Sequence, residues 1–199
     1  MVSIVVMGVS GCGKSTVASA LARELGLEMI DGDDLHLPES VAKMRAGIAL
    51  EDADRWPWLD RIGAYLAAGA PGSRAQGRVV ACSALKRAYR DRIRRLAAPV
   101  QFVFLNGDAE LIARRLALRT GHYMQPELLT SQFRTLEVPA ADETDVVKLD
   151  ISQDVPQLVA GAVAALRRLQ AAAQSSLTPL TSLVPTAPSA GAARPAARI

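Results

Sequence analysis

The segment that most constrains this chain is Gly8-Val9-Ser10-Gly11-Cys12-Gly13-Lys14-Ser15. It matches G-x-x-x-x-G-K-[ST], the phosphate-binding loop. An apolar, β-branched run over residues 2–7 precedes it and a helical pattern over 16–25 follows it, which is the strand–loop–helix context that the motif requires. The glycines let backbone N–H groups point at phosphate oxygens, and the helix N-terminus adds partial positive charge. We therefore expect a nucleoside triphosphate to bind here together with Mg²⁺.

The residues of this loop have distinct expected roles. Lys14 reaches the β- and γ-phosphates and is the expected catalytic cation, while the hydroxyl of Ser15 is expected to ligate Mg²⁺. The residues expected to surround the triphosphate are Gly8, Val9, Ser10, Gly11, Cys12, Gly13, Lys14, Ser15 and Thr16.

Composition narrows the class of protein. The 199 residues suit one domain with a tail, half of them are hydrophobic, and the formal net charge is only +3. The arginines are interpreted as solvated helix faces, so no nucleic-acid partner is expected. Two cysteines cannot form a disulfide framework, and no apolar run approaches the roughly 18 residues of a membrane span. We expect a cytoplasmic protein without membrane contact.

Strand and helix patterns alternate along the chain. The expected strands are 2–7, 27–31, 78–82, 100–105 and 146–149, and the expected helices are 16–25, 84–96, 109–118 and 154–172. This alternation predicts an α/β fold of three layers, with a parallel five-stranded sheet covered on both faces. Ligands of such folds bind at the carboxyl ends of the strands, so the phosphate loop and residues 31–34 should share one rim.

Two segments interrupt the alternation, and the chain ends in a biased segment. Residues 35–76 are mainly helical in pattern, and residues 119–136 lie between the fourth and fifth strands. Long insertions in a compact domain are usually functional, so we expect a substrate-binding insertion and a lid region. Beyond a domain over 1–173, residues 174–199 are rich in Ser, Thr, Pro and Ala, which predicts a disordered tail.

Three aspartates follow the second expected strand. Asp31, at the strand end, is the best placed to orient magnesium-bound water. Asp33, two residues on, would face the same way in an extended chain and would accept a hydrogen bond from a substrate hydroxyl, as the catalytic aspartate of kinases does. The alternative is an acidic turn closed by Asx hydrogen bonds, which applies most strongly to Asp34.

Several blocks together resemble one family, the bacterial-type, thermosensitive gluconokinases, which are phosphate-loop kinases. The blocks are DGDDLH at 31–36, KMRAGIAL at 43–50, DADRWPWL at 52–59, CSALKRAYR at 82–90, GHYM at 121–124 and LTSQF at 129–133. They occur in the family's order. Departures such as Ser40, where asparagine is expected, touch no residue assigned to catalysis.

The resemblance implies a nucleoside-monophosphate-kinase-like fold and transfer of the γ-phosphoryl group of ATP to the 6-hydroxyl of D-gluconate. A homodimer is expected from the resemblance alone. A carboxylate substrate needs cations, and Arg55 and Lys86 are the candidates, while Asp33 and His36 would contact hydroxyl groups. The alternatives are a helix-start salt bridge from Arg55 to Asp52 or Asp54, and a structural role for His36.

The lid region carries further candidates by the same resemblance. Arg119 opens the lid and is expected to reach the transferring phosphoryl group, where a fixed cation lowers the barrier. Arg115 is expected to contact ATP and His122 to contact the substrate, while the neighbouring Arg114 is interpreted as a solvated charge.

Two other functions stay open. A kinase of another small hydroxy acid, such as shikimate, would share the fold and the aspartates after the second strand. A nucleotide-dependent regulatory module without metabolic turnover is the second alternative. A GTP switch would require Asn-Lys-x-Asp after a strand, whereas the fourth strand here is followed by Asn106-Gly107-Asp108.

Overall fold

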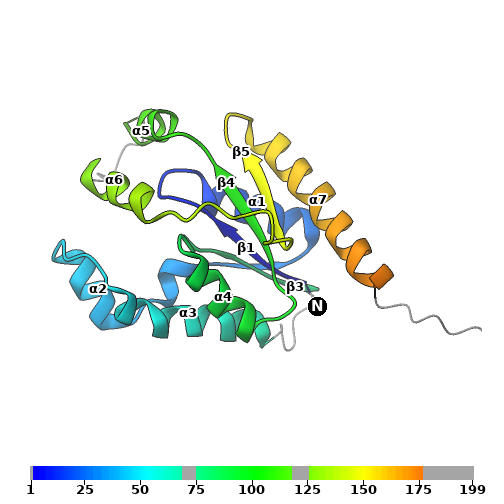
Figure 1. The fold of residues 1–199 in the computed structure, drawn as a ribbon, viewed down its shortest axis with the longest axis horizontal. Helices are drawn as coiled ribbons and strands as arrows, with labels where there is room; N and C mark the ends of the chain where they lie inside the picture. The colour runs from blue at the N-terminus through cyan, green and yellow to red at the C-terminus, as the bar shows by residue number, and fades with distance from the viewer. Residues whose placement is uncertain (1, 69–74, 118–125, 177–199) are drawn as a thin grey trace, which may run out of the picture.

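A computed structural model describes residues 2–68, 75–117 and 126–176 of the chain (Figure 1). The strands are β1 (Val2–Met7), β2 (Glu28–Asp31), β3 (Gly77–Ala81), β4 (Gln101–Asn106) and β5 (Val146–Asp150). The helices are α1 (Lys14–Leu25), α2 (Pro38–Arg45), α3 (Asp52–Ala67), α4 (Arg87–Leu96), α5 (Ala109–Ala117), α6 (Pro126–Thr135) and α7 (Val155–Ser176), with a 3₁₀ turn, η1, over Gly32–Leu35.

The five strands form one parallel sheet in the order β2-β3-β1-β4-β5. The predicted α/β fold with a parallel five-stranded sheet is therefore confirmed. β1 lies between β3 and β4, with Val5 opposite Val80 on one side and Phe102 on the other. Because β1, β3 and β2 are consecutive in the sheet, their carboxyl ends meet at one rim. This rim receives the phosphate loop, the Ser83 segment and the aspartates after β2.

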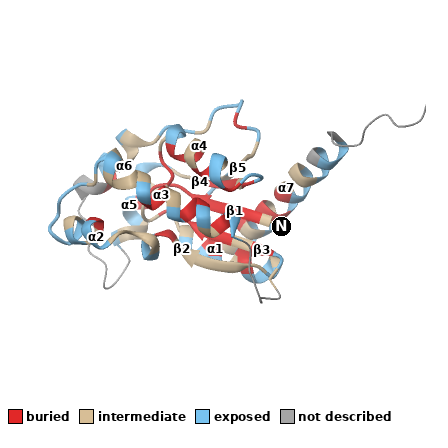
Figure 2. Ribbon diagram, turned by 90° about the horizontal axis from the view of Figure 1, so that it is seen from below, coloured by how far each residue is buried: buried red, intermediate tan, exposed pale blue. Residues whose placement is uncertain are grey.

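Helices cover both faces of the sheet, as Figure 1 shows. Alternate residues of β1 enter different cores, since Ile4 packs with Leu21 of α1 on one face and Val5 packs with Leu59 of α3 on the other. The first core also holds α7 and the second also holds α4. Figure 2 shows the central strands as buried and the helices as a mixture of buried, intermediate and exposed residues, as expected for a parallel sheet covered on both faces.

Two boundaries differ from the sequence-based expectation. α4 begins at Arg87 and not near residue 84, because Ala84 has a φ of +40° and the chain up to Lys86 stays outside the helix. α7 begins as predicted, with the Asp154 carboxylate accepting a hydrogen bond from the Gln157 amide at 2.9 Å. It continues to Ser176, so residues 174–176 are helical and the prediction of a tail from 174 was wrong there. Residues 177–199 lie outside the described part.

The predicted insertion contains α2 and α3, and the predicted lid region contains α6. Their roles as a substrate-binding insertion and a lid stay predictions. In the part of the chain that the structure describes, no helix is both long enough and apolar enough to cross a membrane.

Candidate active site

The phosphate loop connects β1 to α1 at the centre of the sheet rim. Gly8 has a φ of +141°, and a Cβ there would lie 2.8 Å from the carbonyl oxygen of Leu105, so only glycine fits. Gly13, with a φ of +99°, is the N-cap of α1 and makes no side-chain cap hydrogen bond. The first turn of α1 also lacks an acidic residue. Its N-terminal amides and dipole are therefore suited to an anion such as a phosphate group.

The two polar side chains at the start of α1 have clear partners. The Lys14 ammonium donates a hydrogen bond to the Val9 carbonyl at 3.0 Å, which places the charge over the loop itself. The Ser15 hydroxyl donates to Oδ2 of Asp31 at 2.5 Å. A hydroxyl and a carboxylate side by side fit Mg²⁺, which usually keeps several waters and takes one or two protein oxygens. The structure places Ser15 beside Asp31, and their roles toward Mg²⁺ stay predictions.

The chain after β2 turns and does not stay extended. η1 begins directly after Asp31, whose Oδ1 accepts a hydrogen bond from the Asp33 amide at 3.1 Å. The extended-chain argument for Asp33 was therefore wrong, and the Asx turn that was its alternative is present. The Asp33 side chain is nevertheless 88% exposed at the rim. Its pKa is raised, because surrounding protein atoms remove part of its hydration and because the Asp31 carboxylate repels a second negative charge.

His36 lies under this turn as a buried ring. It stacks on Trp58 with centroids 4.3 Å apart, and its Nε2 is 3.9 Å from Oδ1 of Asp33. Burial lowers the pKa of His36, which keeps the imidazole neutral near pH 7. Trp58 is 3% exposed and donates from Nε1 to the Gly32 carbonyl at 2.6 Å, so it is a packing residue. The geometry favours His36 as a support for the Asp33 turn.

A cluster of cations forms between the start of α3 and the start of α4. Lys86 Nζ lies 2.8 Å from both carboxylate oxygens of Asp52, and the Tyr89 hydroxyl also donates to Asp52. Arg55 is 3.8 Å from the same carboxylate and 3.5 Å from the Tyr89 hydroxyl. Hydrogen bonds from Lys86 and Tyr89 lower the pKa of Asp52. The structure therefore brings Arg55 and Lys86 together, and it also shows the helix-start ion pair of Arg55 that was the alternative.

The loop before α4 is held by a buried arginine that the sequence analysis missed. Arg90 is fully buried and donates to the carbonyls of Ala84 at 3.3 Å and Leu85 at 3.2 Å. Its other donors meet both carboxylate oxygens of Glu143, at 2.7 and 2.6 Å. These bonds explain why Ala84 keeps its positive φ and why α4 starts late. A signal was available, since Arg90 falls on the same face of the helical pattern as the apolar Ile93.

The remaining candidates lie on the side of the lid region. Arg115 of α5 donates to the Ile151 carbonyl at 2.5 Å and lies near enough to lower the pKa of the Cys12 thiol, although burial raises that pKa overall. Arg114 is exposed and 3.7 Å from Glu110, consistent with a solvated charge. Arg119 and His122 lie outside the described residues.

Gln132 of α6, which the sequence analysis named only within a block, contacts the phosphate loop. Its Oε1 accepts a hydrogen bond from the Ser10 amide at 2.7 Å, and its Nε2 donates to the Ser10 hydroxyl at 3.0 Å. No local pattern predicts a pair separated by 122 residues in the sequence.

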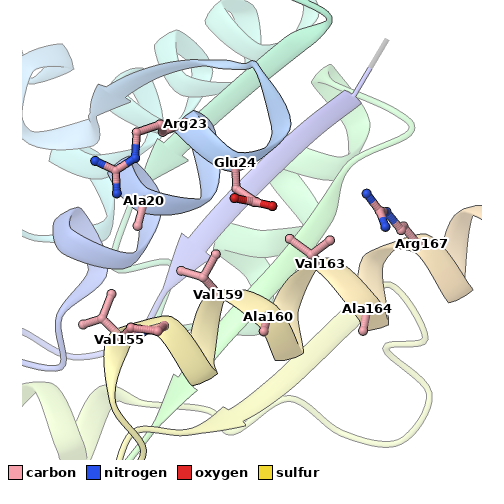
Figure 3. A pocket seen from close by; sticks show the side chains of 10 residues that line it. Ala20, Arg23, Glu24, Val155, Val159, Ala160, Val163, Ala164 and Arg167 are labelled. Atoms are coloured by element: carbon pink, nitrogen blue, oxygen red, sulfur yellow. The ribbon is translucent and has the colours of Figure 1, made fainter.

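A separate open groove of about 540 Å³ runs between α1 and α7 (Figure 3). It is mostly apolar, with charged side chains from Arg23, Glu24 and Arg167. None of the residues predicted to bind ATP or gluconate lines it, so it is not part of the candidate active site.

Comparison with known proteins identifies the relatives of this chain. The family described as an AAA domain matches residues 4–138. The thermosensitive gluconokinase of Escherichia coli (strain K12) is 44% identical over 153 residues, which cover 77% of this chain and 81% of that protein. The crystal structure of a gluconokinase from Sinorhizobium meliloti 1021 superposes with a TM-score of 0.79 at 47% identity, covering 89% of this chain and 98% of that one.

A more distant likeness bears on the alternative function. The shikimate kinase of Aquifex aeolicus superposes with a TM-score of 0.53 over 85% of this chain and 98% of that one, but at 17% identity. This likeness shows the shared fold alone. The similarity to the gluconokinases includes sequence as well as fold, at 44% and 47% identity.

Proposed function

Because the chain belongs to the gluconokinase family of phosphate-loop kinases, we propose that it transfers the γ-phosphoryl group of ATP to the 6-hydroxyl of D-gluconate. The activity of the chain is that of a gluconokinase: it phosphorylates gluconate at the expense of ATP. The position of transfer, the use of Mg²⁺ and the roles of individual residues are the parts that we propose here.

The observation that carries this proposal is the order of charged groups along the rim. The phosphate loop adjoins the Asp33 turn, because the Ser15 hydroxyl donates to Asp31, which also accepts a hydrogen bond from the Asp33 amide. The other side of the turn adjoins α3, the helix that carries Arg55, because Trp58 Nε1 donates to the Gly32 carbonyl at 2.6 Å. The charges therefore follow one another from the phosphate loop through Asp33 to the cation cluster. This order matches a linear substrate with a hydroxyl at one end and a carboxylate at the other.

In the proposed mechanism, the phosphate loop and Lys14 bind the triphosphate and compensate its charge. Ser15 and Asp31 would hold Mg²⁺, Asp31 through water, and the ion when bound would neutralise charge on the phosphate oxygens. Asp33 accepts a hydrogen bond from the acceptor hydroxyl and orients it for in-line attack. Its raised pKa makes it a better proton acceptor, although the loose transition state of phosphoryl transfer makes orientation the larger effect.

The far end of the substrate would meet Arg55 and Lys86. A gluconate carboxylate there would share these cations with Asp52, whose single negative charge leaves the three groups with a net charge of about +1. Tyr89 donates to Asp52 and keeps the cluster in place. The net charge suits a substrate with one carboxylate.

Several sequence-based roles complete the proposal. Arg119 would reach the transferring phosphoryl group, Arg115 the nucleotide and His122 the substrate, with lid closure excluding water. A homodimer stays a prediction from the resemblance. The proposed compartment is the cytoplasm, where Cys12 and Cys82, both free and buried, stay reduced.

The position of transfer is tested by the product. The purified protein is incubated with gluconate, Mg²⁺ and ATP, and the phosphorylated acid is examined by ³¹P–¹H correlation NMR. Coupling of phosphorus to the methylene protons of the 6-position is the expected result. Coupling to a methine proton would place transfer on a secondary hydroxyl and would contradict the proposed orientation of the substrate.

A further inference from the structure

Gln132 connects the predicted lid region to the phosphate loop by two reciprocal hydrogen bonds. The Ser10 amide donates to its Oε1 at 2.7 Å, and its Nε2 donates to the Ser10 hydroxyl at 3.0 Å. Both groups are partly buried. One bond holds the Ser10 backbone amide and the other its side-chain hydroxyl, because an amide side chain has one acceptor end and one donor end.

The internal hydrogen bonds of the phosphate loop near Ser10 both end on the Val9 carbonyl, which accepts from Lys14 Nζ at 3.0 Å and from the Cys12 amide. Gly11, the next residue, has a φ of +82°, and the nearby hydrogen bond from the Cys12 amide to the Val9 carbonyl is long, at 3.4 Å. Neither of these bonds involves Ser10 itself, and Gln132 adds two hydrogen bonds to Ser10 from outside the loop.

The helix that carries Gln132 is itself fixed. Leu129 of α6 is 7% exposed, and Phe133 packs against the same core cluster, which also contains α1 residues such as Leu21. The apolar side of α6 thus docks on the sheet domain and leaves Gln132 pointing at the loop. A helix held by its own core contacts can position another segment precisely enough for catalysis.

The segment after α6 forms hydrogen bonds with the chain around Lys86, just before α4. The Glu137 amide donates to the Leu85 carbonyl at 2.9 Å, and its carboxylate accepts a hydrogen bond from the Arg87 amide at 2.6 Å. Leu85 and Arg87 flank Lys86, the proposed ligand of the gluconate carboxylate. The short segment from Gln132 to Glu137 therefore contacts both the phosphate loop and the loop before α4, which we call the acceptor loop.

We propose that Gln132 is a positioning residue for phosphoryl transfer, which holds the phosphate loop at Ser10 in register with the acceptor loop before α4. This inference rests on the proposed function. Gln132 acts through Ser10 and touches neither reacting atom. Misplacement of a reacting group by about 1 Å can cost on the order of 10²-fold in rate, so loss of this support should appear in kcat.

The first test compares Gln132→Ala with Ser131→Ala, an exposed neighbour on the same helix. We expect Gln132→Ala to lower kcat by roughly 10- to 100-fold, with KM for gluconate within about twofold, while Ser131→Ala behaves as the parent. A kcat within about threefold of the parent would overturn the proposal. An equal loss in Ser131→Ala would also overturn it, since the helix and not the amide contact would then be responsible.

The second variant, Gln132→Glu, keeps the size of the side chain and its acceptor for the Ser10 amide, so it guards against a folding defect in the first. It places a negative charge against the phosphate loop. We expect ATP to bind at least tenfold more weakly, with a ratio to the parent that shrinks as salt screens the charge. Parent-like nucleotide affinity at low salt would show that residue 132 does not lie at the loop and would overturn the proposal.

These readouts separate this inference from the proposed function. If the parent protein fails to phosphorylate gluconate, the proposed function fails, while the nucleotide affinity of Gln132→Glu still tests the contact at Ser10. If the parent is active and Gln132→Ala is equally active, only the positioning role is lost.

Discussion

At the scale of single residues, the hydrogen-bond partners of three carboxylates in the site differ. Asp31 accepts hydrogen bonds from the Ser15 hydroxyl and from the Asp33 amide, which fixes it as the proposed magnesium-side carboxylate. Asp33 extends from the same turn into solvent. Asp52 is engaged by Lys86 and Tyr89 and its pKa is lowered by them. Similar side chains thus take different roles because their hydrogen-bond partners differ.

The role of Asp33 is tested by Asp33→Asn, which keeps size and shape but removes the charge. The acceptor hydroxyl would lose its hydrogen-bond acceptor, so kcat should fall by roughly 10²- to 10⁴-fold, the range for a positioned acid or base. Nucleotide affinity should barely change, because the phosphate loop is untouched. A kcat within about threefold of the parent, well outside that range, would leave Asp33 as part of an acidic turn only.

The role of Lys86 is tested by Lys86→Met, with Lys148→Met on the exposed surface of β5 as the matched control. Loss of a charge-assisted hydrogen bond worth about 1.5–3 kcal/mol should raise KM for gluconate roughly 10- to 100-fold. KM for ATP should stay constant in steady-state kinetics. An unchanged KM for gluconate would mean that Lys86 serves only as the ion-pair partner of Asp52.

At the scale of elements, side chains of α4 form ion pairs with the segment 137–145, and these contacts hold the part of the site that would bind gluconate. Arg90 is buried at the centre, and its partner Glu143 also accepts a hydrogen bond from Arg94 at 2.8 Å. Arg94 binds Asp145 as well, at 2.7 Å. This network shapes the loop before α4, because Arg90 holds the backbone carbonyls of that loop.

Because of this network, the free energy of unfolding should depend on pH in the acid range. Hydrogen bonds from Arg90 and Arg94 lower the pKa of Glu143 to about 2 from a model-peptide value of 4.5, despite burial. A lowered native pKa stabilises the fold fully above about pH 4.5, and the contribution is lost as the pH falls toward 2. The free energy of unfolding of the parent should therefore decrease steeply between pH 4.5 and 3 in urea titrations.

Glu143→Gln should make this decrease shallower and lower the free energy of unfolding by about 3–5 kcal/mol at pH 7, because Arg90 keeps its buried charge without a counter-charge. Asp142→Asn is the control, since Asp142 is exposed and pairs with Arg87 at the surface; its cost should be about 0–1 kcal/mol. Equal costs for the two variants would contradict the importance of the buried pair.

The elements themselves were largely predictable from sequence, and the long-range side-chain pairs were not. Apolar runs are local patterns and indicated the five strands β1 to β5, and the G-x-x-x-x-G-K-[ST] motif indicated the phosphate loop. The pairs Gln132–Ser10 and Arg90–Glu143 join residues far apart in the chain, and no local pattern encodes them. The extended chain assumed after Asp31 failed because its carboxylate closes a turn on the Asp33 amide.

At the scale of the whole molecule, strand order decides which side chains meet. The order β2-β3-β1 places the ends of three strands that are separated by helices in the sequence at one rim. The phosphate loop, the aspartate turn and the loop before α4 therefore converge. The two cores on either side keep these strand ends fixed. The site is therefore built from loops that a rigid sheet positions.

The composition of the chain after α7 leads to a prediction for the whole protein. Removal of residues 177–199 should leave the thermal unfolding midpoint within about 5 °C of the parent, a shift of roughly 1–2 kcal/mol in a domain of this size. The reason is that the segment is rich in Ser, Thr, Pro and Ala, and Pro179 and Pro185 interrupt its few apolar residues. Calorimetry of the two proteins checks this, and a larger fall would show that the segment docks on the domain.

The most direct test of the account is the specificity constant kcat/KM for gluconate beside that for shikimate, measured as ADP release by the full-length protein with Mg²⁺. The account predicts saturable release that depends on gluconate and exceeds that with shikimate by at least about 10²-fold, the discrimination that a few unpaired polar groups produce. Release that is independent of gluconate, or faster with shikimate, would contradict the assignment of this chain as a gluconate kinase.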